Sequence, residues 1–190
     1  MQHYDYTILG AGCAGLCLAL QLAKKEPSKS ILLLESREQY IPDRTWCFWD
    51  VEHTAFEHVV QNRWRKWQVR CGGKKVSSES KRYNYCCIPS DVFYKEACSR
   101  IATSANSTLL MNSKVVSVVD EGEKVFVNTE KGSFTSSLVY DSRPEKTECG
   151  LYQHFVGWKV ETNSPVFAVD EVLLMAGPQP ADRSEEHTSE

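Results

Sequence analysis

The stretch Tyr6-Thr-Ile-Leu-Gly-Ala-Gly-Cys-Ala-Gly15 decides the fold, because it joins a short apolar run directly to a glycine-rich turn. A helix-like run follows at residues 16–23, and a second apolar run from Ile31 to Leu34 ends at Glu35. Short apolar runs bounded by turn signals are typical of buried strands, and longer periodic runs are typical of helices. We therefore predict the order strand, glycine-rich turn, helix, strand, which opens an α/β fold.

Within this unit, three glycines and one acid match a dinucleotide-binding pattern. Gly10 allows the tight turn, Gly12 lets the backbone approach a diphosphate, and Gly15 lets helix and strand pack closely. Ala14 lies at the start of the helix, where the positive end of the helix dipole attracts the diphosphate. Glu35 stands 20 positions past Gly15 and can accept hydrogen bonds from ribose hydroxyls. An adenine dinucleotide site is the interpretation that this context favours, and a purely structural turn is the alternative.

The rest of the chain favours FAD over NAD, because the repeated βαβαβ rhythm of a nicotinamide dehydrogenase is missing. A strand is predicted at 63–70, followed by a capped amphipathic helix from Ser90 to Ile101. The helix is expected to turn Val92, Phe93, Ala97 and Ile101 toward the core. Further strands are predicted at 107–111, 115–119, 125–128 and 134–140. The prediction is an α/β, Rossmann-type FAD-binding domain with inserted strands and a β-meander, incomplete at the C-terminus.

Composition excludes several classes of protein. The 190 residues carry a net charge of −3 and no basic stripe, so nucleic acid is not an expected partner. No signal sequence opens the chain and no apolar run has membrane-spanning length, so a cytoplasmic protein is expected. The eight cysteines form no Cys-x-x-Cys pair, which predicts reduced thiols and no metal site.

Four segments in a fixed order carry a family resemblance: DYTILGAGCAGL, DRTWCFWD at 43–50, VYDSRP at 139–144 and QHFVGWKVE at 153–161. Together they resemble the lycopene cyclase family of FAD-dependent carotenoid enzymes, over about residues 4–175. The expected organisation is an FAD-binding domain with part of the substrate domain at 1–176. Residues 177–190 are expected to be a disordered or non-native tail, because RSEEHTSE is also the translation of a sequencing-adapter oligonucleotide.

The resemblance implies an isomerase, a β-cyclase that closes the ends of lycopene, or of a related carotenoid, into β-ionone rings. Such enzymes protonate an alkene and pass through carbocations with reduced FAD bound, and NADPH is a candidate reductant. A hydrocarbon substrate implies peripheral contact with the inner face of the membrane. Trp46, Phe48, Trp49 and Trp158 are then candidates for the substrate pocket, since aromatic faces stabilise cations. Ordinary packing is the alternative, and in an extended strand Trp46 and Phe48 would face away from Trp49.

Three polar residues have assignments that rest on the resemblance. Arg44 is expected against the FAD diphosphate, with a solvent-exposed arginine as the alternative. Asp141 is expected to contact FAD through a water, or else to form a turn before Pro144. Asp50 is a weak candidate for the general acid.

The family's own acidic residue is a glutamate beyond GWxxE, a position that Glu161 does not match. We therefore expect the chain as written to be a truncated and inactive form. Two alternatives for its function remain open. One is an FAD-dependent monooxygenase or reductase acting on an apolar isoprenoid, and the other is a dinucleotide-binding fragment without activity.

Overall fold

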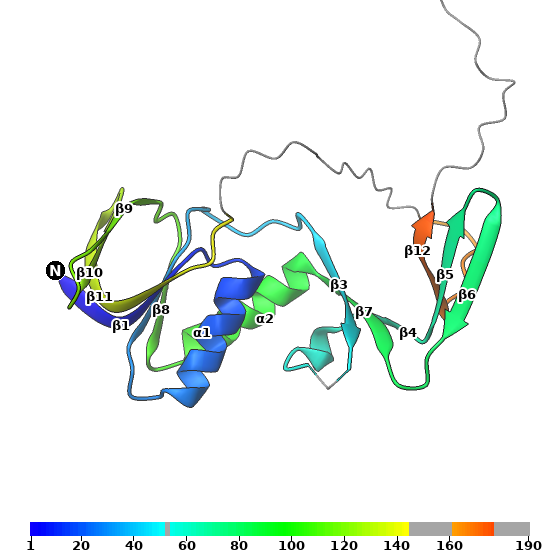
Figure 1. Ribbon diagram of the computed structural model, residues 1–190, viewed down its shortest axis with the longest axis horizontal. Coiled ribbons are helices and arrows are strands. Elements are labelled where there is room, and N and C mark those ends of the chain that lie inside the picture. Colours follow the sequence, from blue (N-terminus) through cyan, green and yellow to red (C-terminus); the bar gives the residue numbers. More distant parts are fainter. Residues whose placement is uncertain (52–53, 145–160, 177–190) are drawn as a thin grey trace, which may run out of the picture. The chain divides into compact units, whose positions relative to one another are not determined.

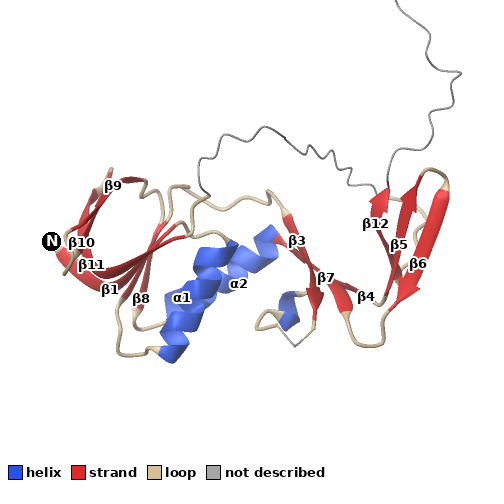
Figure 2. Ribbon diagram, in the orientation of Figure 1, coloured by secondary structure: helices blue, strands red, loops and turns tan. Residues whose placement is uncertain are grey.

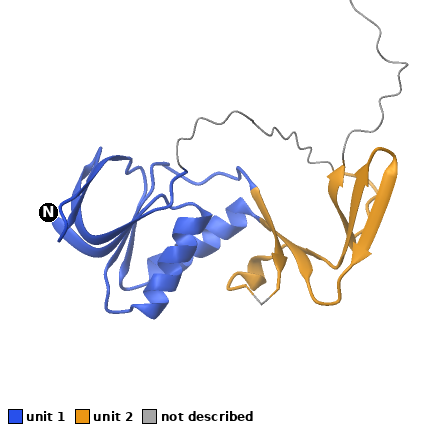
Figure 3. Ribbon diagram, in the orientation of Figure 1, with its two compact units in different colours: residues 1–44, 89–152 blue, residues 45–88, 153–190 orange. Residues whose placement is uncertain are grey.

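The computed structural model describes residues 1–51, 54–144 and 161–176. The chain divides into two compact units (Figure 3). The first contains residues 1–44 and 89–152, and the second contains residues 45–88 and 153–190. The residues that split the first unit in the sequence are therefore those that build most of the second.

The first unit is organised around a six-stranded sheet of order β8-β2-β1-β11-β10-β9 (Figure 1). Its four parallel strands are β1 (Gln2–Leu9), β2 (Ile31–Leu34), β8 (Ser107–Leu110) and β11 (Gly132–Asp141). The antiparallel strands are β9 (Val115–Asp120) and β10 (Val125–Thr129). The expected β-meander is thus β9-β10-β11, whereas β8 pairs with β2 as an additional parallel strand. This is the α/β fold that the sequence predicts.

Two helices pack against each other beside this sheet, α1 (Cys13–Lys25) and α2 (Ser90–Thr103) (Figure 2). Helix α1 contacts β1 and β2, and α2 contacts β8. The centre of the core is β2, whose four residues are all buried, together with Ile8, Leu9 and Leu16. An apolar strand with both faces covered is typical of a parallel sheet.

Two expectations about α2 are wrong. Val92 is exposed, while Phe93 and Tyr94 are buried together with Ala97 and Ile101, so the buried stripe begins one residue later than predicted. Ser90 does not cap the helix through its side chain. Its hydroxyl instead accepts hydrogen bonds from the backbone N–H groups of Asp43 and Arg44, at 3.1 and 3.3 Å. The hydrogen-bond partners of this hydroxyl are therefore the N–H groups of another segment of the same chain, and not those at the start of α2.

The second unit contains two three-stranded sheets, of order β3-β7-β4 and β12-β5-β6. Their strands are β3 (Thr45–Asp50), β4 (Asn62–Trp64), β5 (Lys66–Cys71), β6 (Lys74–Glu79), β7 (Asn84–Pro89) and β12 (Glu171–Ala176), and a 3-10 turn spans Glu57–Val59. The single strand predicted at 63–70 is therefore wrong. The strand is interrupted at Arg65, because β4 pairs with β7 whereas β5 pairs with β6. Among the described residues, no helix has the length and hydropathy that a membrane crossing requires.

Candidate functional site

The glycine-rich turn connects β1 to α1 and is held from two sides. Gly10 has φ of +88°, a conformation that favours glycine, and its N–H donates to the carbonyl of Leu34 at 2.8 Å. The Ser142 hydroxyl lies 2.7 Å from the carbonyl oxygen of Gly10 and 2.9 Å from that of Leu9. The end of β11 therefore fixes a turn that lies more than a hundred residues earlier in the chain.

Gly12 and Gly15 differ in what surrounds them. A Cβ added at Gly15 would lie 2.0 Å from the carbonyl oxygen of Gly10 and 2.8 Å from the Ser142 Oγ, so the helix packs too closely for a side chain. A Cβ added at Gly12 would meet nothing within 4 Å. Gly15 is therefore required by the packing of the protein itself, whereas Gly12 leaves open space at the start of α1. A bound diphosphate would occupy such a space.

Glu35 is held in place by a dense set of hydrogen bonds. Its carboxylate accepts from the Ala11 N–H at 2.9 Å and from the backbone N–H of Arg37 at 2.9 Å. The Arg37 guanidinium adds two contacts of 3.1 Å, one to each carboxylate oxygen. Burial raises the pKa of the Glu35 carboxyl, but these hydrogen bonds together outweigh burial and hold the pKa below its usual range.

Arg37 itself is supported by two stacked tyrosines. The rings of Tyr40 and Tyr94 lie 4.0 Å apart, and the guanidinium lies over both of them. Arg37 also donates to the Tyr94 hydroxyl at 3.1 Å, and Tyr40 donates to the Ala11 carbonyl at 2.8 Å. This cluster was not predicted from the sequence. The short spacing of Glu35 and Arg37 in the sequence could have indicated their ion pair. The contact with Tyr94 could not be predicted, because Tyr94 is distant in the sequence.

The glycine-rich turn, Glu35 and Arg37 surround one pocket of about 430 Å³ in the first unit. Five of the predicted site residues line it, namely Gly10, Gly12, Ala14, Glu35 and Arg44. Residues that the sequence analysis missed also line it, namely Arg37, Asp43, Tyr94, Ser113, Ser142 and Arg143. Four of these missed side chains are arginine or serine, which suits a phosphorylated ligand.

Two of the predicted polar residues make local ion pairs. Arg44 contacts Asp43 at 2.8 Å and keeps 58% of its side chain exposed at the pocket rim. Asp141 accepts from the backbone N–H, Nε and Nη2 of Arg143, at 3.0, 2.8 and 2.6 Å. Its neighbours Ser142, Arg143 and Pro144 line the pocket, and Asp141 is not one of the lining residues. The turn-forming alternative therefore describes the observed contacts of Asp141.

Cys13 begins α1 and lines the same pocket. A side-chain hydrogen bond from Cys17 lowers the pKa of the Cys13 thiol to about 7, although burial acts in the opposite direction. A lowered pKa gives this thiol a larger thiolate fraction at neutral pH than an ordinary cysteine has. We expect iodoacetamide to alkylate Cys13 before Cys98, whose pKa is raised by burial.

If FAD binds in this pocket it covers Cys13, and FAD at about ten times its dissociation constant should then slow the alkylation about tenfold. Peptide mass spectrometry at successive times measures both rates, and Cys98 is the internal reference. Equal alkylation of Cys13 with and without FAD, in a sample that demonstrably binds FAD, would contradict this placement.

The aromatic run DRTWCFWD forms strand β3 in the second unit. Trp49 contacts the rings of Trp67 and Tyr85, with centroids 4.7 and 4.9 Å away. The burial of β3 alternates, with Trp46 and Phe48 half-buried and Cys47 and Trp49 exposed. Alternation along a strand places Trp46 and Phe48 on the opposite face from Trp49, so the three rings do not share one surface.

Asp50 closes β3 as a buried carboxylate. Its Oδ2 lies 3.5 Å from the Nη1 of Arg63, whose other nitrogen contacts Glu57 at 3.3 Å. The Arg63 guanidinium is thus the cationic neighbour of the Asp50 side chain. Trp158 lies outside the described residues.

This chain is similar in sequence to known proteins over most of its length. The sequence profile of the lycopene cyclase protein family matches residues 5–183. A lycopene beta-cyclase of Pantoea ananas is 32% identical over 172 residues, which is 86% of this chain and 42% of that protein. This chain thus spans less than half the length of the curated relative that it matches.

Solved structures match at the level of the fold. A p-nitrophenol 4-monooxygenase from Pseudomonas putida has a TM-score of 0.65 at 16% identity, over 78% of this chain and 43% of its own. A probable FAD-dependent monooxygenase from Pseudomonas aeruginosa has a TM-score of 0.56 at 15% identity, over 73% and 42%. The chain thus shares its fold with these monooxygenases over about three quarters of its length. The profile match covers most of the chain, and we conclude that this chain belongs to the lycopene cyclase family.

Proposed function

We propose that the protein containing this chain is a lycopene β-cyclase that holds reduced FAD in the pocket of the first unit. The observation that carries the proposal is the family match over residues 5–183, and it is supported by a pocket in the same chain that the glycine-rich turn and Glu35 line. The reaction is an isomerisation, in which protonation of a terminal double bond creates a tertiary cation. The neighbouring alkene attacks this cation, and loss of a proton leaves the ring.

The residues present fit FAD. The open space at Gly12 and the first N–H groups of α1 would hold the diphosphate, where the helix dipole favours negative charge. Glu35 would accept from the ribose hydroxyls at the end of β2, and Arg44 and Arg143 would contribute positive charge at the rim. Reduced FAD supplies an electron-rich ring that can stabilise a nearby cation. NADPH is the proposed source of the reducing equivalents.

Within the described residues, the substrate side of the proposal rests on the rings of Trp49, Trp67 and Tyr85. Their faces can stabilise positive charge by up to about 2 kcal/mol each when water is excluded. Trp49 keeps 41% of its surface exposed, so part of its ring is accessible to a ligand. Trp46, Phe48 and Trp158 remain proposed pocket residues, and Trp46 and Phe48 would reach a substrate only from the opposite face of β3.

Production of the complete protein in cells that accumulate lycopene tests the function. We expect β-ring pigments whose mass equals that of lycopene, because cyclisation rearranges bonds without adding or removing atoms. The fold likeness to monooxygenases favours oxygen insertion as the second candidate, and oxygen insertion would raise the product mass by one oxygen atom. Chromatography with mass spectrometry separates these outcomes, and unchanged lycopene would contradict both.

The same cells decide the role of Asp50. If the ion pair with Arg63 is its whole contribution, an Asp50→Asn variant still yields β-ring pigments. If Asp50 is the general acid, no ring forms while the folded protein and its flavin persist.

A hydrocarbon substrate also places the enzyme at a lipid surface. We propose that the protein lies in the cytoplasm, at the inner face of the membrane, and contacts it peripherally. Lycopene dissolves in the acyl region of a bilayer and not in water, so the protein must meet its substrate there.

A further inference from the structure

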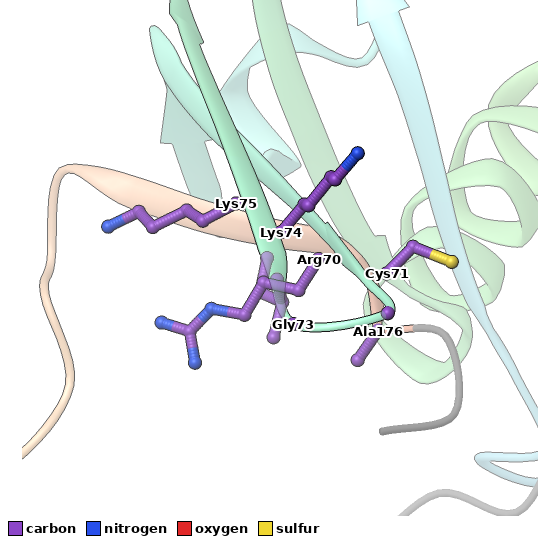
Figure 4. Close-up of a pocket in the computed structure, with 8 residues that line it drawn as sticks. Arg70, Cys71, Gly73, Lys74, Lys75 and Ala176 are labelled. Atoms are coloured by element: carbon purple, nitrogen blue, oxygen red, sulfur yellow. The ribbon is translucent and has the colours of Figure 1, made fainter. Parts of the chain in front are cut away.

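The hairpin of β5 and β6 ends in a tight turn at Gly72-Gly73, with φ of +55° and +75°. Two consecutive residues of positive φ are typical of a two-residue hairpin turn. The register places Arg70 opposite Lys75 and Cys71 opposite Lys74. Figure 4 shows the side chains of Arg70 and Lys75 on one side of the hairpin, and those of Lys74 and Cys71 on the other.

Three cations therefore gather at the hairpin tip, and two of them stand directly opposite each other. Like charges at opposed positions of an antiparallel pair are destabilising. Arg70 donates to Gln68, but in the described parts of the chain no carboxylate pairs with Arg70, Lys74 or Lys75. At the other end of β5, Lys66 forms an ion pair with Asp170 at 2.8 Å. The tip is thus a local excess of positive charge on a chain whose net charge is −3, and an external anion would relieve the repulsion.

Exposed apolar side chains surround these cations. Val76 is 66% exposed, Met175 64% and Leu173 47%. Val76 lies two residues after Lys74 and so shares its face, while Leu173 pairs beside Gln68 on the face of Arg70. Arg70, Lys75 and Leu173 line a cavity of about 350 Å³ with the turn glycines. Both faces of the tip therefore combine positive charge with apolar surface.

We propose that this hairpin tip docks on a bilayer surface containing anionic phospholipid headgroups. Val76, Met175 and Leu173 enter the boundary of the acyl region, and Arg70, Lys74 and Lys75 stay at the level of the phosphates, their long stems lying along apolar surface. Apolar side chains between the cations fit a lipid surface better than they fit nucleic acid. The proposal rests on the proposed function only in that a hydrocarbon substrate is found in the bilayer.

Vesicle flotation of the 190-residue chain tests this surface. We expect binding to vesicles of phosphatidylcholine with phosphatidylglycerol, and much weaker binding to phosphatidylcholine alone. A Lys74→Gln/Lys75→Gln variant should bind about 30-fold more weakly, about five-fold for each lysine. The matched control is Lys24→Gln/Lys25→Gln, which removes two adjacent exposed lysines from the end of α1 and should change binding less than about two-fold.

A second pair of variants tests the apolar contribution. Val76 and Val116 are each 66% exposed, and Val116 lies on β9 of the first unit. Val76→Ser should weaken vesicle binding several-fold, and Val116→Ser should leave it unchanged. Thermal unfolding followed by circular dichroism confirms that all four variants are folded.

The docking surface is overturned if the unmodified chain ignores anionic vesicles, or if both lysine pairs weaken binding equally. Equal affinity for heparin and for the vesicles, unaffected by Val76→Ser, would identify a general polyanion site instead. Ring formation from lycopene by the complete protein in detergent is measured separately. A cyclase without this docking surface, or a docking surface without cyclisation, can therefore be recognised.

Discussion

A Gly15→Ala variant is expected to lose the native glycine-rich turn, because the added Cβ would lie 2.0 Å from the carbonyl oxygen of Gly10. Both atoms belong to the backbone or are attached to it directly, so no side-chain rotation relieves the overlap. We expect the free energy of unfolding to fall by at least about 3 kcal/mol, the upper end of ordinary overpacking costs. The midpoint of urea unfolding measures this loss, and flavin absorbance should disappear with it.

The companion variant Gly12→Val separates folding from binding. The added Cβ meets nothing within 4 Å in the protein alone, so the midpoint of unfolding without FAD should stay near that of the unmodified chain. Flavin binding should nevertheless be lost, because the side chain would fill the space proposed for the diphosphate. Gly132→Val is the matched control, since its Cβ also meets nothing within 4 Å but it is the first residue of β11, next to the turn from β10.

These outcomes can fail in distinguishable ways. A Gly12→Val protein that keeps flavin at full stoichiometry would show that the cofactor does not lie against this turn. A Gly15→Ala protein as stable as the unmodified chain would show that the turn shifts freely. Loss of flavin in the Gly132→Val control would mean that flavin content reports general damage.

A Glu35→Ala variant is the second change with a large expected effect. It removes five hydrogen bonds at once, which come from Ala11, Ser36 and Arg37, and it takes the carboxylate away from the half-buried Arg37 guanidinium and from the Ala11 N–H. We expect destabilisation by about 2–4 kcal/mol, since hydrogen bonds to charged groups contribute more than neutral ones. We also expect loss of flavin binding. Glu38→Ala is the control, because Glu38 is an exposed glutamate three residues further along the same segment.

The same carboxylate predicts a dependence on pH. The folded protein holds the pKa of Glu35 below its usual value of about 4.3, so the ionised form stabilises the fold. This contribution is fully present above the unfolded pKa and is lost as pH falls below about 4 and through the folded pKa. Urea unfolding at a series of pH values should show an acid-dependent loss that is smaller in Glu35→Gln. Identical acid profiles for the two proteins would contradict the assignment.

Local patterns in the sequence were sufficient for the elements of the first unit. The apolar runs at 6–9 and 31–34 form β1 and β2, and the run at 16–23 lies within α1. The fold class and the family are confirmed. Each depends on residues close together in the chain, where hydrogen-bond spacing and side-chain periodicity act directly. The ends of a strand and the buried face of a helix depend on the elements that pack beside them. The strand predicted at 63–70 and the buried stripe predicted for α2 were therefore wrong in their bounds.

The sequence by itself determined the glycine-rich turn, the acid at the end of β2 and the alternation of β3, because each follows from backbone sterics or from the two-residue period of a strand. Only the tertiary structure decided that Ser142 holds Gly10 across 132 positions, and that Tyr94 supports Arg37 across 57. It also decided that the Ser90 hydroxyl accepts hydrogen bonds from the backbone N–H groups of Asp43 and Arg44. Such contacts depend on which strands pair and in which register. That choice is made by burying apolar surface across the whole core, and no local segment carries it.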